Sequence, residues 1–341
     1  MSSQRRSSPG AAGAGSLPLT TSEELDVLRP EWEALHASVR DATVFTHPAW
    51  LETWLQHCGG QAMPIFLSVR RDEELAGIIA LDMDPANPGL LGEPGVSDLG
   101  PILAAPGEEY AVARGLLEWL NEDMAPAAST WGLPERSPLV MAIQELADDF
   151  GWNCHVDEEA VTPVRELAST FEDYLDTLSK KDRHELRRKL RQADDAGALA
   201  FEEYTTPDAI APHIDQFLDF MRQSHAGKAA FLDDATAAFF RNALQVTAAL
   251  GVTRLGVLTV DDAPIAMTWC FDNAEETLLY NSGYDAAHAA IAPGIVSKAR
   301  ALESAILRGK RRFNFLRGEE EYKFRMGGQR RILARLDLRH R

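Results

Sequence analysis

The sequence predicts an α/β (α+β) fold made of two similar halves, each a mixed, twisted sheet flanked by helices. Strand-like segments alternate with segments of helical period along most of the 341 residues. Two stretches in different halves, SVRRDEELAGIIAL at 68–81 and LTVDDAPIAMTW at 258–269, each contain a strand, an acidic turn and a second strand. Helices and further strands follow both stretches in the same order, so we expect an internal duplication. A chain of this length can form two domains of ordinary size.

A flexible tail is expected at residues 1–20, which are rich in Ser, Gly and Ala, followed by an N-terminal domain at 21–168. Apolar residues at helical spacing, such as Leu28, Trp32 and Leu35, identify its helices. We predict helices at about 22–37, 48–57, 108–122 and 137–149, strands at 64–70, 75–82, 130–131, 152–156 and 162–167, and a Pro- and Gly-rich loop at 84–107.

The C-terminal domain is expected at 169–341, with the segment HAGKAAFL at 225–232 as a loop between two helices. We predict its helices at about 171–178, 179–196, 208–224, 233–250, 293–308 and 318–325, and its strands at 254–260, 263–271, 277–283, 312–316 and 331–338.

The helix predicted at 293–308 carries the argument for a binding site. Pro293 suits the first helical position because it has no N–H to lose. Ala292 has no side-chain oxygen to accept from the free N–H groups of the first turn, and Gly294 leaves the backbone without a Cβ. A helix start of this kind after a strand favours phosphate binding. Water in the same place is the plainer alternative.

The charge distribution is uneven. The net charge of −18 disfavours broad binding to nucleic acid or to anionic membranes. Seven Lys and Arg residues nevertheless lie in 180–191 and ten in 308–335. These two basic segments either bind a discrete anionic ligand or cover solvated faces of the molecule.

The cysteines predict neither a disulfide framework nor a metal site. Cys58, Cys154 and Cys270 lie far apart and have no metal-binding spacing, which favours a reducing cytoplasm. No apolar segment approaches the roughly 18 residues that span a bilayer, and no signal peptide is indicated. We expect a cytoplasmic protein without a membrane span or a metal cofactor.

Several motifs together resemble a known family. They are EWEAL at 31–35, FTHPAWLETW at 45–54, KKDRHELRRKLRQ at 180–192, HAGKAAF at 225–231, SGYDAAHAAIAPG at 282–294 and FNFLRGEEEYKFRMG at 313–327. Their order and spacing resemble the GNAT acyltransferase fold, and more closely the tandem-GNAT group of CelD/BcsL-type proteins and FemAB-like transferases. The resemblance covers nearly all of 22–338 and is stronger in the second half.

The resemblance implies acyl transfer from a CoA thioester, with the diphosphate on the helix that follows the third strand of the hairpin sheet. The implied CoA-binding residues are Tyr284, Pro293, Gly294 and Ile295. The usual Gly-rich diphosphate loop (Arg/Gln-x-x-Gly-x-Gly/Ala) is absent, because DAAHAAIAPG has a single glycine. CoA binding therefore follows from the resemblance and not from a signature.

The family carries a Tyr-Lys or Phe-Lys pair where this chain has Tyr322 and Lys323. Tyr322 could return a proton to the leaving sulfur, and Lys323 could stabilise the oxyanion or a phosphate. A packed ring and a surface ion pair explain the same residues structurally. Asp285 and His288 are candidate bases, although an ordinary loop carboxylate and an exposed imidazole are equally consistent.

Four basic residues are candidates for binding an anionic substrate or a CoA phosphate. On the predicted helix at 179–196 the basic residues align on one face, which is also what a solvated helix presents. The candidates are Arg183, Arg187, Lys228 and Arg317.

Three functions are therefore considered. The first is an N-acyltransferase that uses acyl-CoA, most simply acetyl-CoA, on a small amine- or hydroxyl-bearing acceptor, with a link to cell-surface polysaccharide suggested by the CelD/BcsL resemblance. The second is a FemAB-like transferase that uses aminoacyl-tRNA, which the net charge of −18 disfavours. The third is a non-catalytic domain that binds a glycan or a partner protein. The sequence does not indicate the oligomeric state.

Overall fold

The computed structural model describes residues 18–83, 88–122 and 126–341. The tail predicted for residues 1–20 lies outside these ranges up to residue 17. Leu19 and Thr20, which we assigned to that tail, instead begin strand β1 (Leu19–Glu23), because they pair with Arg70 and Val69 of β2 (Pro64–Arg71). Backbone pairing at the sheet edge orders these two residues despite their polar neighbourhood.

Within the described residues, fourteen strands form one sheet in the order β1-β2-β3-β4-β6-β14-β8-β13-β12-β11-β10-β9, with β5 beside β3 and β7 beside β14. The remaining strands are β3 (Glu74–Asp82), β4 (Gly89–Leu90), β5 (Ile102–Ala104), β6 (Ala127–Ser129), β7 (Leu133–Pro134), β8 (Trp152–Glu166), β9 (Leu199–Tyr204), β10 (Thr253–Val260), β11 (Ala263–Asp272), β12 (Glu276–Tyr284), β13 (Arg312–Asn314) and β14 (Gln329–His340). The mixed sheet flanked by helices confirms the predicted fold class.

The two hairpins confirm the repeated pattern in the sequence. Asp72 and Glu73 join β2 to β3, and Asp261 and Asp262 join β10 to β11. All four have positive φ values, between 50° and 70°. Two consecutive left-handed residues twist a turn in the sense that suits antiparallel strands, and Asp is among the residues that tolerate this conformation.

The two halves share a central antiparallel ladder. Strands were predicted separately at 152–156 and 162–167, but β8 is continuous because β14 pairs along its whole length, from Gln329 opposite Val164 to His340 opposite Trp152. β14 also pairs with β6 and β7 of the N-terminal half. The final strand of the chain therefore completes the first half of the sheet, and the predicted boundary at 168/169 stays a prediction.

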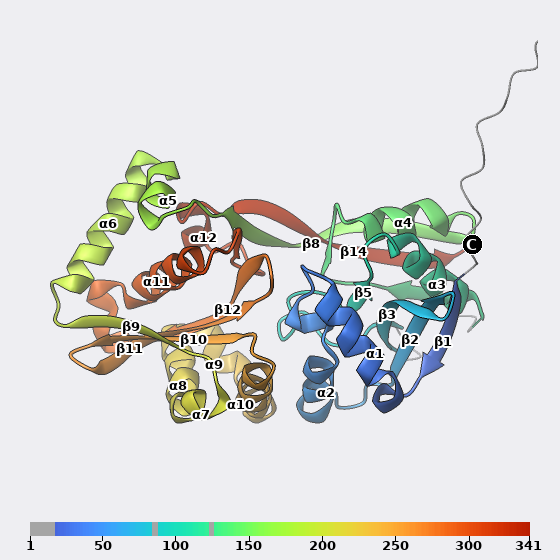
Figure 1. The fold of residues 1–341 in the computed structure, drawn as a ribbon, viewed down its shortest axis with the longest axis horizontal. Helices are drawn as coiled ribbons and strands as arrows, with labels where there is room; N and C mark the ends of the chain where they lie inside the picture. Colours follow the sequence, from blue (N-terminus) through green and yellow to red (C-terminus); the bar gives the residue numbers. More distant parts are fainter. Residues whose placement is uncertain (1–17, 84–87, 123–125) are drawn as a thin grey trace, which may run out of the picture.

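Helices cover both faces of the sheet. They are α1 (Leu25–Ser38), α2 (Pro48–His57), α3 (Glu109–Glu122), α4 (Pro138–Ala147), α5 (Phe171–Thr177), α6 (Lys180–Asp194), α7 (Pro207–Ile210), α8 (Ile214–Ser224), α9 (Ala226–Phe231), α10 (Asp234–Ala249), α11 (Pro293–Leu307) and α12 (Glu321–Arg325), with 3₁₀ turns η1 (Val44–Thr46), η2 (Ala211–His213) and η3 (Ala286–Ile291). In the C-terminal half, α5, α6, α11 and α12 lie on one face and α7 to α10 on the other (Figure 1). Helix α9 lies in the predicted loop at 225–232, and β9 was not predicted.

An aromatic core joins the halves. Trp50 of α2 packs edge-on against Phe239 of α10 and Tyr280 of β12, with ring centroids 5.1 and 5.6 Å apart. The Tyr280 hydroxyl donates to the carbonyl oxygen of Val96, in the predicted loop at 84–107, at 2.7 Å. Edge-to-face rings of this kind add to the stability that their burial provides. This packing fixes β12, the strand that borders the site, against the N-terminal half.

Candidate functional site

Strand β12 is paired with its neighbour β13 over only its first residues. It runs parallel to β13 only where Glu276–Leu278 pairs with Arg312–Asn314, and then continues alone on that side to Tyr284. A bulge interrupts the β11–β12 ladder between Trp269 and Cys270, where Asn281 and Leu279 are the partners. Unpaired backbone on β12 therefore borders an opening in the sheet.

The start of α11 confirms the predicted helix start. Ala292 is its N-cap, with φ 51° and ψ 48° and no side-chain cap. The carbonyl oxygen of Ala292 accepts from the N–H groups of Ile295 and Val296 at 3.0 and 3.1 Å. The N–H of Gly294 has no partner among the described residues. Of the first-turn N–H groups that we expected to be free, that of Gly294 is therefore the one without a partner, because those of Ile295 and Val296 donate to Ala292.

Gly294 is required by close packing. A Cβ on this residue would lie 2.9 Å from Cδ1 of Tyr284. The aromatic ring of Tyr284 thus lies directly against the first turn of α11. A larger residue at position 294 would displace that ring.

A cavity of about 630 Å³ opens at this helix start. This volume is in the range of small-molecule sites. It is lined from α8, α9, β12, η3, α11 and the segment around α12, by Ser224, His225, Gly227, Lys228, Phe231, Ser282, Tyr284, Ala289, Ala292, Pro293, Gly294, Ile295, Lys298, Glu320 and Tyr322.

Two lysine ammonium groups face the cavity. Lys298, one turn into α11, is 7% exposed and donates to the carbonyl oxygen of Gly294 at 2.8 Å. Burial, followed by repulsion from Lys228, lowers the pKa of Lys298 to about 7. Lys228 of α9 donates to Oδ1 of Asn281 at 2.8 Å and to the carbonyl oxygen of Ser282, and burial lowers its pKa to about 8.

Glu320 is the single carboxylate among the residues that line this cavity. Its Oε2 lies 2.9 Å from Nζ of Lys323. Burial favours the neutral form of Glu320, but the charges of Lys323 and Lys228 outweigh it and lower the carboxyl pKa. The Glu320 charge is therefore already matched by Lys323, which leaves Lys228 and Lys298 without a carboxylate of their own.

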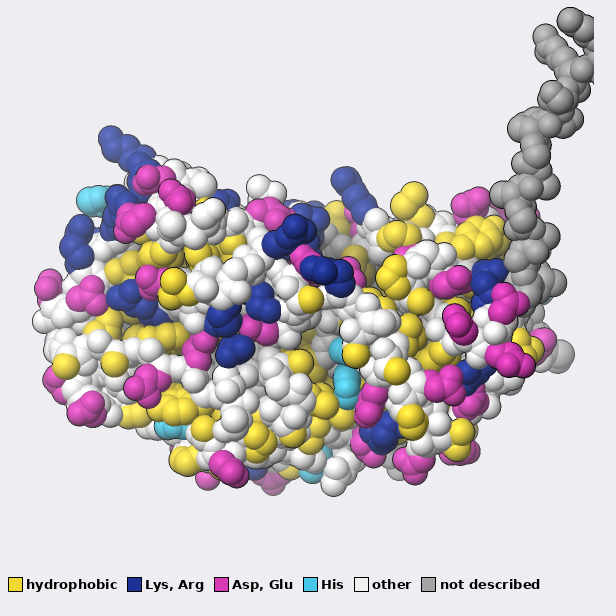
Figure 2. Space-filling model, viewed as in Figure 1, with side chains coloured by type: hydrophobic (Ala, Val, Ile, Leu, Met, Phe, Trp, Pro, Cys, Tyr) yellow, Lys and Arg dark blue, Asp and Glu magenta, His cyan; other side chains and the backbone are white. Residues whose placement is uncertain are grey.

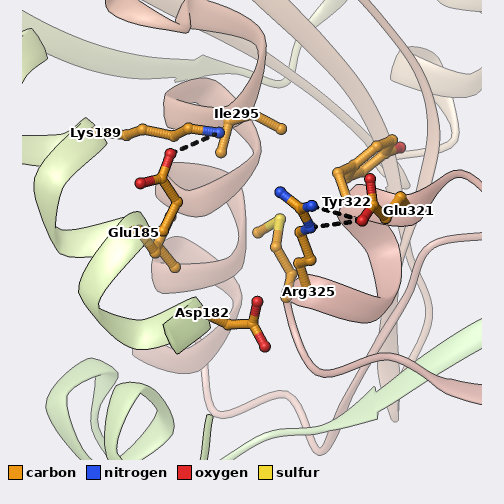
Figure 3. Close-up of a pocket in the computed structure, with 9 residues that line it drawn as sticks. Asp182, Glu185, Lys189, Ile295, Glu321, Tyr322 and Arg325 are labelled. Atoms are coloured by element: carbon orange, nitrogen blue, oxygen red, sulfur yellow. Dashed lines mark hydrogen bonds and ion pairs between the residues drawn. The ribbon is translucent and has the colours of Figure 1, made fainter. Parts of the chain in front are cut away.

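A narrow crevice between α6 and α12 adjoins the cavity (Figure 3). It has a volume of about 110 Å³ and shares Ile295 and Tyr322 with the cavity. Its two cations each pair with a glutamate of the crevice wall. Lys189 lies 3.7 Å from Glu185, and Arg325 lies 2.5 Å from Glu321. Both cations of the crevice thus have a carboxylate partner, unlike the two lysines of the cavity.

The comparisons with known proteins agree with this geometry. Residues 180–324 match the family described as an acetyltransferase (GNAT) domain. A solved structure of FemX has a TM-score of 0.65 and 11% identity, covering 94% of this chain and 96% of that one. A tandem GNAT protein from the clavulanic acid biosynthesis pathway has a TM-score of 0.50 and 14% identity, covering 94% and 98%. Residues 180–324 thus match the GNAT acetyltransferase domain family, and the chain as a whole has the fold of the tandem GNAT protein and of FemX.

A conserved protein of unknown function from Bacteroides thetaiotaomicron VPI-5482 has the same fold, with a TM-score of 0.62 and 14% identity over 94% of this chain and 99% of that one. No curated protein sequence matches the chain. In the part of the chain that the structure describes, no helix has the length and apolar character to cross a membrane, and no group of three or more His, Cys, Asp or Glu side chains could hold a metal ion.

The predicted Tyr-Lys pair of this GNAT domain is divided between two environments. Tyr322 lines the cavity, and burial raises the pKa of its hydroxyl well above the ordinary value. Lys323 is 2% exposed and does not line the cavity. Its ammonium donates to the carbonyl oxygens of Leu316, Arg317 and Gly318 at 3.2, 2.6 and 3.3 Å, around the left-handed Leu316 (φ 54°). Lys323 thus stabilises the turn at Leu316–Gly318.

The other predicted site residues are distributed as follows. Tyr284, Pro293, Gly294, Ile295 and Lys228 line the cavity. Asp285 and His288 do not. They bond to each other at 3.1 Å, and the Asp285 carboxylate also caps η3 by accepting from the N–H of Ala287.

The predicted arginines lie outside the cavity lining. Arg183 and Arg187 of α6 pair with Asp176 and Glu172, on the face where Figure 2 shows Lys and Arg side chains among acidic ones. Arg317 bonds to Glu159 at 2.9 Å and to the carbonyl oxygen of Asp98. On α6 these ion pairs are also what a solvated face presents, and anion binding by Arg183 and Arg187 stays a prediction.

Helix α3 takes the place of α11 in the N-terminal half, since it follows β5 as α11 follows β12. Its start is acidic. The carboxylate of Glu109 accepts from the N–H of Gly107 at 3.0 Å. A carboxylate in the first turn of a helix repels an anion from the helix start. Unlike α11, which has no acidic residue in its first turn, α3 is therefore poorly suited to bind an anion there.

Sequence reasoning missed Lys298 and Glu320. A signal for Lys298 was available, because it lies three residues after Ile295 and four before Leu302, which places it on the apolar stripe of α11. A lysine on a buried stripe is unusual and indicates either an ion pair or a site. Glu320 carried no such signal, since two further glutamates adjoin it.

Proposed function

We propose that the chain transfers an acyl group from acyl-CoA, most simply acetyl-CoA, to a small acceptor. The acceptor group is an amine or, alternatively, a hydroxyl. The observation that carries the proposal is the cavity that extends from the uncapped N–H of Gly294 along the unpaired side of β12 to Tyr322. In this proposal the helix start binds the diphosphate and the thioester lies beside β12.

The chemistry requires a base for the acceptor amine and a proton donor for the leaving thiolate. The acceptor nitrogen attacks the thioester carbonyl carbon, the C–N bond forms and the C–S bond breaks. Glu320, ionised at neutral pH because its pKa is lowered, is the candidate to take the proton from the acceptor amine. Tyr322, kept protonated by its raised pKa, is the candidate to donate to the departing thiolate.

Calorimetry with acetyl-CoA, free CoA and tRNA tests the proposal, together with release of free thiol in the presence of amino sugars, amino acids and polyamines. Gly294→Glu should abolish CoA binding, because the carboxylate repels the diphosphate and the side chain displaces Tyr284. Leu307→Glu is the matched control. It adds the same charge at the other end of α11, where Leu307 is 83% exposed. Equal CoA affinity in both variants would remove the helix start from the site.

Similarity to FemX supports a second candidate, transfer from aminoacyl-tRNA. The net charge of −18 opposes it, because a tRNA ligand carries a long polyanionic backbone. Saturable binding of charged tRNA without binding of CoA would favour this second candidate. A link to cell-surface polysaccharide stays part of the proposal and is tested by the amino-sugar acceptors.

A further inference from the structure

The cavity carries an unmatched positive charge. Lys228 and Lys298 line it from two different helices, α9 and α11, while the one lining carboxylate, Glu320, is engaged by Lys323. Buried ammonium groups are costly unless an anion or a set of acceptors compensates them. In the adjoining crevice the chain supplies such partners to Lys189 and Arg325. In the cavity it supplies neutral acceptors, Oδ1 of Asn281 and the carbonyl oxygens of Ser282 and Gly294, but no free carboxylate.

The direction of Lys298 places its charge at the helix start. Its Nζ reaches back one turn to the carbonyl oxygen of Gly294, as helical side chains lean toward the N-terminus. The ammonium and the free N–H of Gly294 therefore belong to the same turn of α11. The ammonium also lies 4.9 Å from the ring centre of Tyr322, so its remaining N–H groups lie at the cavity wall.

We propose that Lys228 and Lys298 bind the diphosphate of the thioester donor and so replace the Gly-rich loop that this chain lacks. The inference rests on the proposed function, since it concerns the same ligand. A Gly-rich loop supplies several backbone N–H donors, whereas α11 offers that of Gly294. Two ammonium groups supply the missing charge and donors.

Binding should take up protons. The titratable groups around the pair are Glu320, Lys323 and Tyr322 around α12, Cys270 on β11, and His225 and Tyr284 of the same cavity lining. Burial lowers the pKa values of both ammonium groups toward neutrality, so part of each population is neutral in the free protein near neutral pH. A bound diphosphate favours the charged forms of both, so CoA binding should take up protons.

The test compares CoA, dephospho-CoA (without the 3′-phosphate) and acetyl-pantetheine (without the diphosphate) by calorimetry in buffers of different ionisation enthalpy. Lys228→Met and Lys298→Met should each weaken CoA and dephospho-CoA by about 10- to 100-fold and reduce the proton uptake. Both should leave acetyl-pantetheine affinity unchanged. Lys310→Met is the matched control, a partly buried lysine that faces Asp272 at 3.7 Å away from the cavity.

The outcomes separate the two proposals. If the unmodified protein binds CoA and transfers the acyl group but the lysine variants keep full CoA affinity, the lysine assignment is wrong and the proposed function stands. If the lysine variants bind CoA more weakly but bind dephospho-CoA with full affinity, the lysines contact the 3′-phosphate, and the assignment is overturned. Loss of turnover alone would make them catalytic residues and also overturn it. If the unmodified protein binds none of the three ligands, the proposed function itself fails.

Discussion

Replacing Lys298 with Met should stabilise the protein at neutral pH. The pKa of this lysine falls from 10.5 to about 7 on folding. Each pKa unit corresponds to about 1.4 kcal/mol, so protonated Lys298 lowers the free energy of unfolding by about 5 kcal/mol. Methionine removes this cost and fills a similar volume. It also loses the hydrogen bond to Gly294, worth about 1 kcal/mol.

The sign follows from the direction of the pKa change. Because the folded-state pKa is depressed, the native protein has its full stability above about pH 10.5 and loses it as the pH falls through about 7. Lys298→Met should therefore be about 3–4 kcal/mol more stable than the unmodified protein at pH 6.5, and the gain should vanish or reverse by about 1 kcal/mol near pH 10.

Urea unfolding at pH 6.5, 8 and 10 measures this difference directly. Lys310→Met, whose ammonium faces the Asp272 carboxylate, controls for the loss of a partly buried lysine and should show no such dependence on pH. Parallel stability curves for Lys298→Met and the unmodified protein would refute the reasoning, because they would mean that Lys298 titrates as an ordinary lysine.

Four further outcomes are expected. Asp98→Asn should raise the free energy of unfolding by up to about 3 kcal/mol above pH 6 and leave it unchanged near pH 4, as measured by urea unfolding. Burial raises the Asp98 pKa from 3.8 to about 6, so the stability that this residue contributes below pH 3.8 is lost as the pH rises through 6. An equal gain at both pH values would contradict this reasoning. Lys323→Met should lose about 2–4 kcal/mol, because three carbonyl oxygens lose their donor, and an unchanged unfolding midpoint would exclude that role. Gly294→Ala should weaken CoA binding measurably by displacing Tyr284, whereas equal affinity would mean that the ring moves freely. Tyr322→Phe should lower kcat for acetyl transfer at least tenfold with little change in CoA affinity, and a loss confined to affinity would make Tyr322 a binding residue only.

Local chemistry was sufficient to predict the hairpins and the main helix of the C-terminal half. Two acidic residues between β-type segments permit the left-handed turn, as Asp72 and Asp261 show. A Pro-Gly pair before an apolar stripe identified the start of α11 at Pro293. Each of these signals lies within a few consecutive residues, so it can be recognised in the sequence without knowledge of distant contacts.

Features that depend on distant partners were not predictable in this way. β8 is one strand because β14, more than 160 residues later in the chain, supplies its ladder. The edge strand β9 alternates in burial but is short, and only pairing with β10 defines it.

The candidate site was likewise predictable only in part. Pro293 and Gly294, predicted from the helix start, and Tyr284, implied by the family resemblance, all line the cavity. The direction of a long side chain is not encoded locally. Lys323 turns away from the cavity because the carbonyl groups of the Leu316 turn lie within its reach, and Lys298 turns toward it because its own helix offers the Gly294 carbonyl.

The position of β14 constrains how the molecule is assembled during synthesis. The ribosome delivers residues 329–340 after all the other described strands, yet those residues fill the gap between β6 and β8 in the first half. Until they arrive, both neighbouring strands present open edges that could pair with other chains. A fragment cut after residue 168 would lack β14, and we therefore expect it to expose the edges of β6 and β8.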